Sequence, residues 1–446
     1  MKLHLVSLGC ARNQVDSEIM LGLLKKAGWT ITDNPSEAQV IVVNTCSFIE
    51  SAAQESIDTI LELASLKEEG ACRRLIVAGC LPERYREKIS HELPEVDFFL
   101  GTGAYDRIVD VVEETIVSQK WLLPPPEERP VDPPDALRLP TSFYSAYIKV
   151  AEGCSRKCTY CIIPKLRGRM RSRPLGDIIT EAGRLIELGA KELNLVAQDS
   201  TSWGYDLDPP QHPAELLKAL SKFGDSAWIR LLYGHPDRFD DRLIHAMGNE
   251  PGICAYFDIP IQHAGSKILK KMGRNYSRDD LTVLFQKIRN MVPEAVLRTT
   301  LIVGFPGETQ KDMEELLEFI EEVRFDHLGV FTYSDEDDLP SHNLAGHVSK
   351  KTAIKRFERI MIAQAGISEK NNEKYIGCEL DVLVEEAPED GVFIGRTWFQ
   401  APDVDGITYI RTLDKPFLKS FDASIGSVVR VKIMDTMEYD LIGEPL

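Results

Sequence analysis

The sequence lacks long apolar runs, a secretory leader and a surplus of positive charge. No stretch approaches the roughly 18 apolar residues that a membrane-spanning helix needs. The short apolar start at residues 1–12 is soon followed by Asp16 and Glu18. A phosphate-binding loop is also missing, because Gly304–Glu308 lacks the Lys-Ser/Thr pair that such a loop requires. These absences exclude a membrane protein and a secreted disulfide scaffold, and they predict a cytoplasmic protein.

The chain does contain enough apolar material for two or three domains. Its 446 residues are 43% hydrophobic and 27% charged, a composition typical of globular rather than disordered chains. The 70 acidic residues exceed the 52 basic ones by 18, which disfavours loose binding to nucleic acid because an acidic surface repels a polyanion. For the nine cysteines we expect metal-binding or catalytic roles rather than disulfides.

A proline-rich stretch divides the chain. Seven of the seventeen residues at 124–140 are proline, which lacks the N–H that helices and sheets use, so we expect an extended linker there. Before the linker, strands alternate with helices, and this alternation predicts an α/β domain with a parallel, doubly wound sheet. The expected strands are 2–7, 40–44 and 75–78, and the expected helices are 15–27, 51–69 and 105–117.

After the linker the alternation returns on a larger scale. Six strand–helix repeats predict a full or partial (β/α) barrel with its functional groups at the carboxyl ends of the strands. From residue 377, short alternating runs separated by Gly, Pro and Asp predict a small all-β barrel. We therefore expect domains at 1–118, 140–372 and 373–446, with the linker at 119–139. The expected strands are 146–151, 192–197, 228–233, 255–259, 297–303 and 327–332, then 380–384, 392–397, 408–412 and 428–433.

Three cysteines lie together just after the first strand of the second domain. Cys154, Cys158 and Cys161 have the spacing C-x₃-C-x₂-C. Three thiolates on one loop can bind three irons of a [4Fe–4S] cluster and leave the fourth iron open to a substrate or cofactor, whereas electron-transfer clusters usually have four cysteines. Arg156 and Lys157 would favour the thiolate forms. Zinc is the alternative, but no fourth ligand is evident nearby.

This loop, on the first strand of a six-fold βα array, resembles the radical S-adenosylmethionine (SAM) superfamily. The resemblance implies that the open iron binds the methionine part of SAM, which is cleaved to a 5′-deoxyadenosyl radical. Two later stretches, which contain Gln198 and Asp199 and Gly304–Glu308, lie at expected strand ends. Taken alone, each is explained by an ordinary strand–helix turn as well as by a SAM contact. Together with the cysteine loop, they favour SAM contacts. The implied cofactor-binding residues are Tyr160, Gln198, Asp199, Gly304, Pro306, Gly307 and Glu308.

A second set of cysteines is dispersed along the first domain. Cys10, Cys46 and Cys80 each lie three residues or fewer beyond an apolar strand. Corresponding strand ends of a parallel sheet share one rim, where such sheets bind ligands, so we expect these cysteines to meet and again to leave one iron open. A single cysteine in such a place is usually a small buried hydrophobe. The remaining thiols, predicted to be packing or surface residues, are Cys72, Cys254 and Cys378.

Gly9–Glu18 and Asn44–Ala52 resemble the signature stretches of the methylthiotransferases, a radical-SAM family, and the likeness covers essentially the whole chain. It implies two [4Fe–4S] clusters, six catalytic cysteines and a C-terminal OB-like barrel of the TRAM type. One SAM would methylate a sulfur at the first cluster, and a second would generate the radical that abstracts hydrogen from the target carbon. A radical route suits an unactivated C–H bond, which has no acidic proton.

The family divides into enzymes acting on a tRNA adenosine and one acting on an aspartate of ribosomal protein S12. Residues 376–446 carry 14 acidic and 6 basic side chains, which is a poor surface for RNA but suits a basic protein; solubility is the plainer explanation. Residues 167–174 resemble the basic form of the ribosomal-protein branch. We predict methylthiolation of the S12 aspartate at its β-carbon. A tRNA adenosine is the first alternative, and a non-catalytic iron–sulfur relay or scaffold is the second.

Some roles stay open at this point. The implied reaction requires a sulfur-donor and an electron-donor protein, and we expect neither a membrane nor direct tRNA binding. The basic residues between 165 and 173 could attract the acidic target, contact RNA or form a solvated loop. His235 and His263 lie near expected strand ends, where a hydrogen-bonded structural role is commoner than catalysis.

Overall fold

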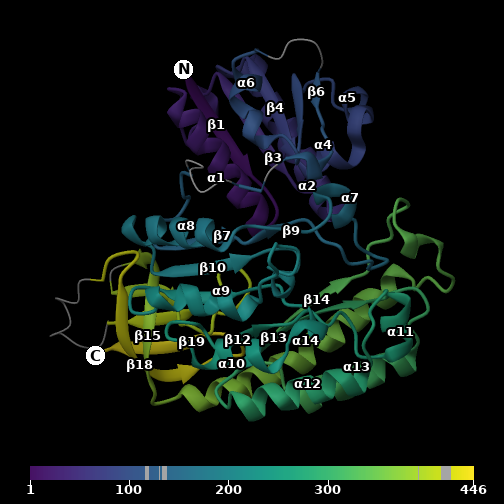
Figure 1. Ribbon diagram of the computed structural model, residues 1–446, viewed down its shortest axis with the longest axis vertical. Coiled ribbons are helices and arrows are strands. Elements are labelled where there is room, and N and C mark those ends of the chain that lie inside the picture. The colour runs from purple at the N-terminus through teal and green to yellow at the C-terminus, as the bar shows by residue number, and fades with distance from the viewer. Residues whose placement is uncertain (116–119, 130, 133–137, 390, 413–422) are drawn as a thin grey trace.

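Three units follow one another along the chain, and the predicted fold class is confirmed (Figure 1). The computed structural model describes residues 1–115, 120–129, 131–132, 138–389, 391–412 and 423–446. A six-stranded parallel sheet comes first, two three-stranded parallel sheets come second and a closed five-stranded barrel comes last. Within these residues, no helix has the length and apolar character that crossing a membrane demands.

The first unit is a parallel sheet with helices on both faces. Its strand order is β2-β1-β3-β4-β5-β6. Successive strand residues face opposite sides, so Val40 and Val42 join the core beneath α1 and α6, whereas Ile41 and Val43 join the core beneath α2. The elements are β1 (Lys2–Ser7), α1 (Ala11–Lys26), β2 (Thr30–Ile31), β3 (Val40–Thr45), α2 (Glu50–Ala64), α3 (Leu66–Glu69), β4 (Arg74–Gly79), α4 (Cys80–Tyr85), α5 (Ile89–Glu92), β5 (Phe98–Gly101), α6 (Ile108–Val112) and β6 (Trp121–Leu122).

The topology of this sheet predisposes one edge to bind a ligand. From β1 the chain adds β2 on one side and then returns to add β3 on the other. Such a switch point leaves a crevice outside the carboxyl ends of the strands, where α/β sheets bind their ligands. The ends of β1, β3 and β4 are neighbours at this edge.

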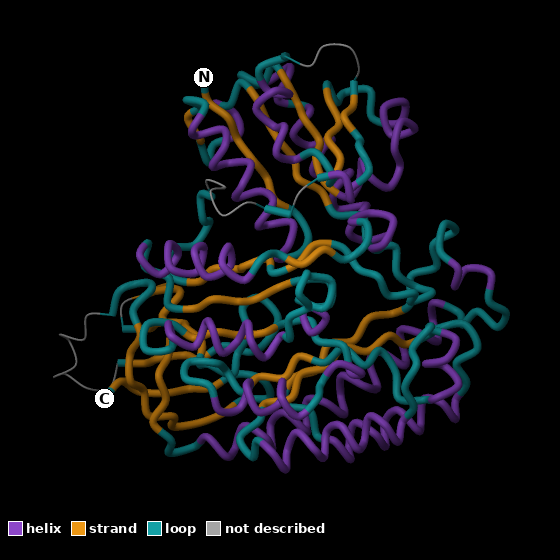
Figure 2. Tube along the Cα trace, in the orientation of Figure 1, coloured by secondary structure: helices purple, strands orange, loops and turns teal. Residues whose placement is uncertain are grey.

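The second unit contains the six predicted parallel strands as an open, partial barrel. Strands β7, β10 and β11 form one sheet and β12, β13 and β14 the other, and a single bridge between Ile229 and Ile253 joins the two. Figure 2 shows the strands as a layer with the long helices packed along it. The elements are β7 (Ser145–Lys149), β8 (Ala151–Glu152), α7 (Ile163–Arg167), β9 (Arg171–Ser172), α8 (Leu175–Glu187), β10 (Glu192–Val196), α9 (Pro213–Leu220), β11 (Trp228–Leu231), α10 (Asp241–Asn249), β12 (Tyr256–Asp258), α11 (Ser266–Lys271), α12 (Arg278–Met291), β13 (Val296–Val303), α13 (Gln310–Val323), β14 (His327–Thr332) and α14 (Lys350–Asn372).

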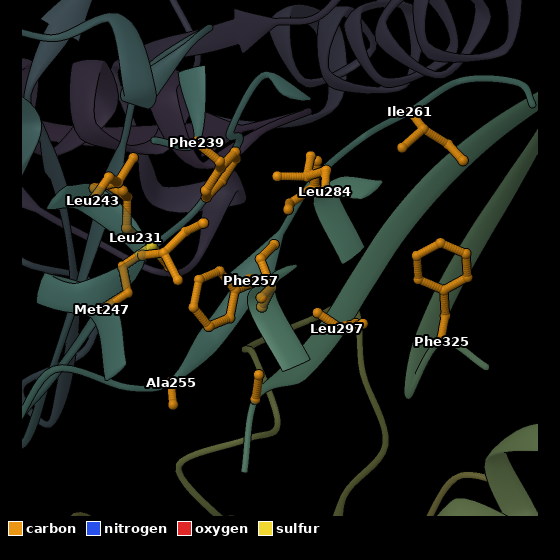
Figure 3. Packing of buried hydrophobic residues seen from close by; sticks show 14 of the residues in the cluster. Leu231, Phe239, Leu243, Met247, Ala255, Phe257, Ile261, Leu284, Leu297 and Phe325 are labelled. Atoms are coloured by element: carbon orange, nitrogen blue, oxygen red, sulfur yellow. The ribbon is translucent and has the colours of Figure 1, made fainter. Parts of the chain in front are cut away.

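Alternation along these strands separates an apolar outer face from a polar interior. Leu231, Phe257 and Leu297 point outward and pack with helix residues such as Leu243 and Leu284 (Figure 3). The alternate positions carry the buried charges Lys149, Glu192, Arg230 and Asp258 and the largely buried Arg298. The barrel interior therefore contains buried ion pairs beside apolar and aromatic side chains such as Val196 and Tyr256.

The third unit closes the amino-terminal end of this interior. Its barrel has the order β15-β16-β17-β19-β18, and β19 (Leu441–Pro445) is a strand that the sequence pattern did not predict. Arg396 donates to Glu192, the first residue of β10, and Tyr256 at the start of β12 donates to Asp405. The other barrel strands are β15 (Glu379–Glu389), β16 (Val392–Arg396), β17 (Thr408–Arg411) and β18 (Val428–Thr436).

The proline-rich segment is packed rather than freely extended where the structure describes it. Strand β6 lies within the predicted linker, yet it pairs with β5, so the first sheet continues past residue 118. Arg129 and Asp132 are buried and ion-paired, and the Arg129 guanidinium lies 3.6 Å from the centre of the Tyr105 ring. Prolines 130, 133 and 134 lie outside the described residues. The domain boundaries at 118, 139 and 372 stay predictions.

A buried ionic network joins the first unit to the second. The Lys149 ammonium is completely buried and contacts Asp16 of α1 at 2.5 Å, Glu152 at 2.8 Å and Asp132 at 3.0 Å. Arg167 adds a second contact to Asp16 at 2.5 Å. Because isolated buried charges are costly, each of these groups depends on the others for compensation.

Replacing Lys149 with Met should therefore destabilise the protein strongly. The substitution leaves Asp16, Asp132 and Glu152 buried without their shared cation, and we expect a loss of about 3–5 kcal/mol of unfolding free energy in urea denaturation of the apoprotein. Lys2→Met is the matched control, because the Lys2–Glu37 pair is about half exposed and such pairs contribute at most about 1 kcal/mol. Equal stability of both variants would show that the network does not hold the two units together.

Candidate functional site

The three dispersed cysteines of the first unit come together at the ligand-binding edge of its sheet. Cys10 follows β1 and caps α1, Cys46 follows β3, and Cys80 opens α4 directly after β4. The negative charges of Cys10 and Cys46, when ionised, raise the pKa of the Cys80 thiol. The structure thus places Cys10, Cys46 and Cys80 at one edge of the sheet, and their role as ligands of one cluster stays a prediction.

Side chains of the two signature stretches hold the cysteine loops against one another. The Asn13 amide donates to the carbonyl oxygens of Leu8, Asn44 and Thr45 at 2.6–3.3 Å, and so ties the Cys10 loop to the Cys46 loop. The Thr45 hydroxyl donates to the Ala78 carbonyl at 2.6 Å and accepts the Leu81 N–H at 3.2 Å. Those two bonds fix the turn that carries Cys80.

Two glycines allow these turns to approach closely. Gly9 has a φ of +92°, and a Cβ there would lie 2.5 Å from the Cys46 Cβ. Gly79 has a φ of +95°, and a Cβ there would lie 2.4 Å from the Asn44 Oδ1. Only glycine adopts such backbone angles without strain and leaves room for the neighbouring turn.

The charges around this set favour one thiolate over the other two. Burial works against ionisation of Cys10, but Arg12, Arg167 and backbone N–H groups outweigh it and bring the pKa of Cys10 below its ordinary value. Burial raises the pKa of Cys46, and it raises that of Cys80 to about 12 although an Arg167 nitrogen lies 3.7 Å from its sulfur. A bound cation or metal cluster would be needed to keep all three thiols deprotonated.

The second set of cysteines lies on the loop that follows β8. Burial raises the pKa of Cys154 and raises that of Cys161 to about 12, with the neighbouring thiols adding to the effect. Arg156 lowers the pKa of Cys154, as predicted, although burial outweighs this effect, and it also forms ion pairs with Asp199 at 2.9 Å and Asp237 at 2.7 Å. In its described conformation Arg156 therefore anchors the loop to the end of β10.

Neither set has the geometry of a single-ion site. Among the residues that the structure describes, no three His, Cys, Asp or Glu side chains converge as the ligands of one ion do. In an iron–sulfur cluster the cysteine ligands are distributed over several irons, so three thiolates that bind a cube need not converge on one point.

Several buried polar atoms beside the two sets lack a hydrogen-bond partner within the described part of the chain. They are the Ser47 hydroxyl, next to Cys46, and the Gln198 Oε1 and Ser200 hydroxyl, at the end of β10. Orphaned buried polar groups are rare in folded proteins, and a bound polar group would satisfy them. These residues therefore fit an inorganic cluster at the first set and a polar cofactor such as SAM beyond β10.

The predicted SAM contacts fall into two groups. Gln198 donates to Glu152 at 2.8 Å, and Asp199 accepts from Arg156, Thr201 and Ser202. The Tyr160 hydroxyl accepts two bonds from Arg274, at 2.6 and 3.1 Å. All three lie at the carboxyl end of the partial barrel, where a cofactor could reach the second cysteine set.

The loop from Gly304 to Glu308 is explained by its own hydrogen bonds. The Glu308 carboxylate accepts the N–H groups of Gly304 and Phe305 at 2.6 and 3.1 Å and pairs with Arg356 of α14 at 3.0 Å. Gly307 packs against the Lys271 side chain, and the Pro306 carbonyl accepts from Lys271 at 3.3 Å. These contacts suit the strand–helix turn alternative, and a SAM contact for this loop stays a prediction.

The basic run after the cysteine loop is largely neutralised inside the protein. Arg167 pairs with Asp16, Arg173 pairs with Glu181 at 2.5 Å, and Arg171 donates to backbone carbonyls of the linker. Of the two histidines, His235 bonds Asp237 at 2.6 Å, and His263 is buried and accepts the Gly265 N–H at 2.7 Å. Burial lowers the pKa of His263 to about 4, so it is a neutral structural residue at neutral pH.

A cavity of about 180 Å³ is lined by residues that neighbour cysteines of both sets. Phe48 and Ile49, just beyond Cys46, form one wall, and Tyr160, between Cys158 and Cys161, lines another. Thr300, Ile302, Phe331 and Tyr333 come from the ends of β13 and β14, and the remaining lining residues are Gln262, Thr332, Ser334, Glu336 and Leu339. The sequence did not single out this cavity, because its walls come from five distant segments.

Comparison with known families matches three stretches of the chain. Residues 2–101 match an uncharacterized protein family, UPF0004, residues 148–320 match the radical SAM superfamily, and residues 376–446 match the TRAM domain. The order of these matches is the order of the three units in the structure.

Curated relatives resemble the chain over its full length. Ribosomal protein uS12 methylthiotransferase RimO from Desulfosudis oleivorans is 53% identical over 446 residues, which cover 100% of both chains. The proteins of the same name from Geobacter sulfurreducens and Clostridioides difficile are 46% and 45% identical, over 98% and 99% of their own lengths and 99% and 100% of this chain.

Solved structures share the fold at low identity. A radical S-adenosylmethionine methyltransferase, TsrM, from Kitasatospora setae, solved with cobalamin and a [4Fe–4S] cluster bound, superposes with a TM-score of 0.56 at 13% identity, over 88% of this chain and 79% of that one. The same enzyme with tryptophan and a SAM analogue gives a TM-score of 0.55 at 13% identity, over 74% and 72% of the two chains.

The opposite pKa shifts of Cys10 and Cys161 predict different reactivity in the apoprotein. Both residues are partly accessible, but a thiol with a pKa of about 12 is less than about one-thousandth ionised at pH 8. Because the thiolate is the nucleophile, iodoacetamide should alkylate Cys10 at least about tenfold faster than Cys161. Peptide mass spectrometry after timed labelling measures both rates.

Arg12→Gln provides the matched variant for this measurement. Removal of the Arg12 charge should raise the pKa of Cys10 and slow its alkylation at pH 8, with little effect on Cys161. Equal rates at Cys10 and Cys161 in the wild-type apoprotein would contradict the electrostatic description of the first set.

Proposed function

Since the chain belongs to the ribosomal protein uS12 methylthiotransferases of the RimO type, we propose that it is a radical SAM enzyme that adds a methylthio group to the β-carbon of an aspartate in uS12. The observation that carries this proposal is a cavity whose lining includes neighbours of both three-cysteine sets, namely Phe48 and Ile49 beyond Cys46 and Tyr160 between Cys158 and Cys161. A ribosomal substrate puts the reaction in the cytoplasm, and the reaction also requires donors of sulfur and of electrons.

Each cysteine set would hold one [4Fe–4S] cluster with one iron free of protein ligands. Clusters bound there would supply the electron that cleaves SAM and the site at which sulfur is held for transfer. At the first set, Arg12 and Arg167 offset the negative charge of the thiolates, and Asn13 and Thr45 hold the loops in place. At the second set, Arg156 is anchored by carboxylates and positions the loop.

SAM would bind at the carboxyl end of the partial barrel, beside the second set. The Gln198 Oε1 and the Ser200 hydroxyl are buried and free to bond it. The Tyr160 ring lines the cavity, and its hydroxyl is oriented by Arg274. Asp199 serves mainly to hold Arg156 and the cysteine loop, and the Gly304–Glu308 loop would contribute backbone contacts.

The cavity supports a protein side chain as the target. Its volume is about 180 Å³, its walls are mostly apolar and aromatic, and two of its lining residues, Phe48 and Phe331, are exposed. The third unit, with 14 acidic and 6 basic residues over 376–446, suits a basic ribosomal protein better than tRNA. A tRNA adenosine remains the alternative substrate. One gene-deletion strain tests both substrates, because uS12 and tRNA can be analysed from the same cells.

Mass spectrometry of cellular products tests the substrate. Deletion of the gene should remove the methylthio group from uS12 and leave the methylthio-adenosine of tRNA unchanged, and restoring the wild-type protein should return the uS12 modification. Loss of the tRNA modification with intact uS12 would refute the proposal in favour of the tRNA alternative.

The two-cluster assignment predicts that each cysteine set holds half of the iron. Replacing Cys154, Cys158 and Cys161 with alanine should leave about half of the wild-type iron, and so should replacing Cys10, Cys46 and Cys80. Colorimetric iron analysis and electron paramagnetic resonance of the anaerobically reconstituted proteins measure the outcome. Cys378→Ala, at an exposed thiol of the third unit, is the control and should retain all of it. Total loss of iron in either triple variant would argue against independent clusters.

A further inference from the structure

The acidic segment Ser334–Asp338 follows β14 and lies on the rim of the cavity, where it contacts elements next to both cysteine sets. Ser334 and Glu336 line the cavity. Lys165, on the helix after the second set, donates to the Asp338 carbonyl at 2.5 Å. From the first unit, the Glu50 N–H donates to the Ser334 hydroxyl at 3.4 Å. The segment is therefore a junction between the two units at the point where they enclose the cavity.

Arg84 donates four hydrogen bonds at this junction. Its side chain is only 4% exposed, although it lies on the short helix α4, which begins with Cys80. Its guanidinium contacts Asp338 through two nitrogens, at 2.6 and 3.3 Å, and Glu336 at 2.9 Å. Its remaining nitrogen donates to the carbonyl of Ser47, the residue after Cys46, at 2.8 Å. One side chain thus joins the Cys46 loop and the Cys80 helix to the rim of the cavity.

We propose that Arg84 is a positioning residue that sets the first cysteine set at the correct distance from the substrate cavity; this inference rests on the proposed function. A bidentate guanidinium–carboxylate contact has a fixed geometry that a single-point contact lacks. Transfer of sulfur to a carbon radical requires the two reacting atoms to be aligned closely, and small misplacements reduce such rates strongly. Arg84 touches neither the target nor a cysteine, and it acts through the Cys46 loop.

The charges around Arg84 favour its ionised form and so stabilise its contacts with Glu336 and Asp338. Burial opposes the charge on Arg84, but the hydrogen bond to Asp338 and the charges of Glu336 and Asp338 raise its pKa above the ordinary value. Ser334 donates to the other oxygen of Glu336 at 2.7 Å, which leaves that carboxylate little freedom to leave Arg84.

The test separates positioning from folding and from radical formation. Arg84→Gln removes the ionic contacts with Glu336 and Asp338, and Arg84→Lys retains the charge without the bidentate geometry. Arg107→Gln is the control, since Arg107 is half exposed and pairs with Asp110 on the surface. Each reconstituted protein is assayed with uS12 for iron content, 5′-deoxyadenosine and methylthiolated product.

We expect Arg84→Gln to retain full iron and to release 5′-deoxyadenosine within about twofold of wild type. Its yield of methylthio product per 5′-deoxyadenosine should fall roughly tenfold or more. Arg84→Lys should be intermediate, and Arg107→Gln should match wild type. A parallel fall of both products, loss of iron in Arg84→Gln or an unchanged ratio would each overturn the positioning role.

A measurement on the apoprotein keeps this inference distinct from the proposed function. In hydrogen–deuterium exchange, Arg84→Gln should speed exchange of the peptide covering 44–52 and leave the peptide covering 192–200 unchanged. If wild-type enzyme cleaves SAM but does not modify uS12, the proposed substrate is wrong, while faster exchange at 44–52 would still support Arg84 as the holder of the Cys46 loop. Unchanged exchange at 44–52 would refute that role.

Discussion

The buried ionic network around Lys149 is the constraint on which the rest of the site depends. Removing Lys149, Asp16 and Glu152 from water is costly, and their contacts with one another, with Asp132 and with Arg167 compensate for it. The contacts of Asp16 with Lys149 and Arg167 form only when the first unit is seated on the second. The network also reaches the first cysteine set, because Arg167 contacts both Asp16 and the sulfur of Cys80. The same charges that hold the two units together therefore orient one cysteine set relative to the other.

The two ends of the partial barrel differ: the amino-terminal end is closed by the third unit, and the carboxyl end carries the candidate site. At its amino-terminal end, Glu192 pairs with Arg396 of the third unit and with Arg230, so this end is closed by buried ion pairs. The carboxyl end carries the cysteine loop and the cavity. In Figure 1 the yellow barrel and the loops beyond β14 accordingly lie on opposite sides of the second unit. The acidic third unit is thus not a wall of the cavity.

Sequence patterns predicted the elements whose signals are local. Long alternations of apolar strands and helices identified the three units, and cysteines directly after strands predicted both cysteine sets. The edge strand β6 (Trp121–Leu122) and the barrel strand β19 were missed, since they are defined by distant partners rather than by their own residues. The basic residues after the second cysteine set could not be assigned from sequence for a similar reason. Arg167 and Arg173 are paired with Asp16 and Glu181, which lie elsewhere in the chain. Arg84 carried no signal at all before the fold placed Glu336 and Asp338 beside it.

The acidic barrel lies apart from the cavity, so association with a substrate and alignment of its target side chain depend on different interactions. Exposed charges act over about one Debye length, roughly 8 Å at physiological ionic strength, and they mainly affect how fast a basic partner associates. Alignment of a single side chain with two cysteine sets depends instead on buried, short-range contacts, such as those of Asn13, Arg84 and Lys149. Salt should therefore weaken association with a basic partner without disturbing the cavity, because the contacts that shape the cavity are shielded from solvent. The surplus of negative charge and the six strand-end and loop cysteines thus belong to different steps of one reaction.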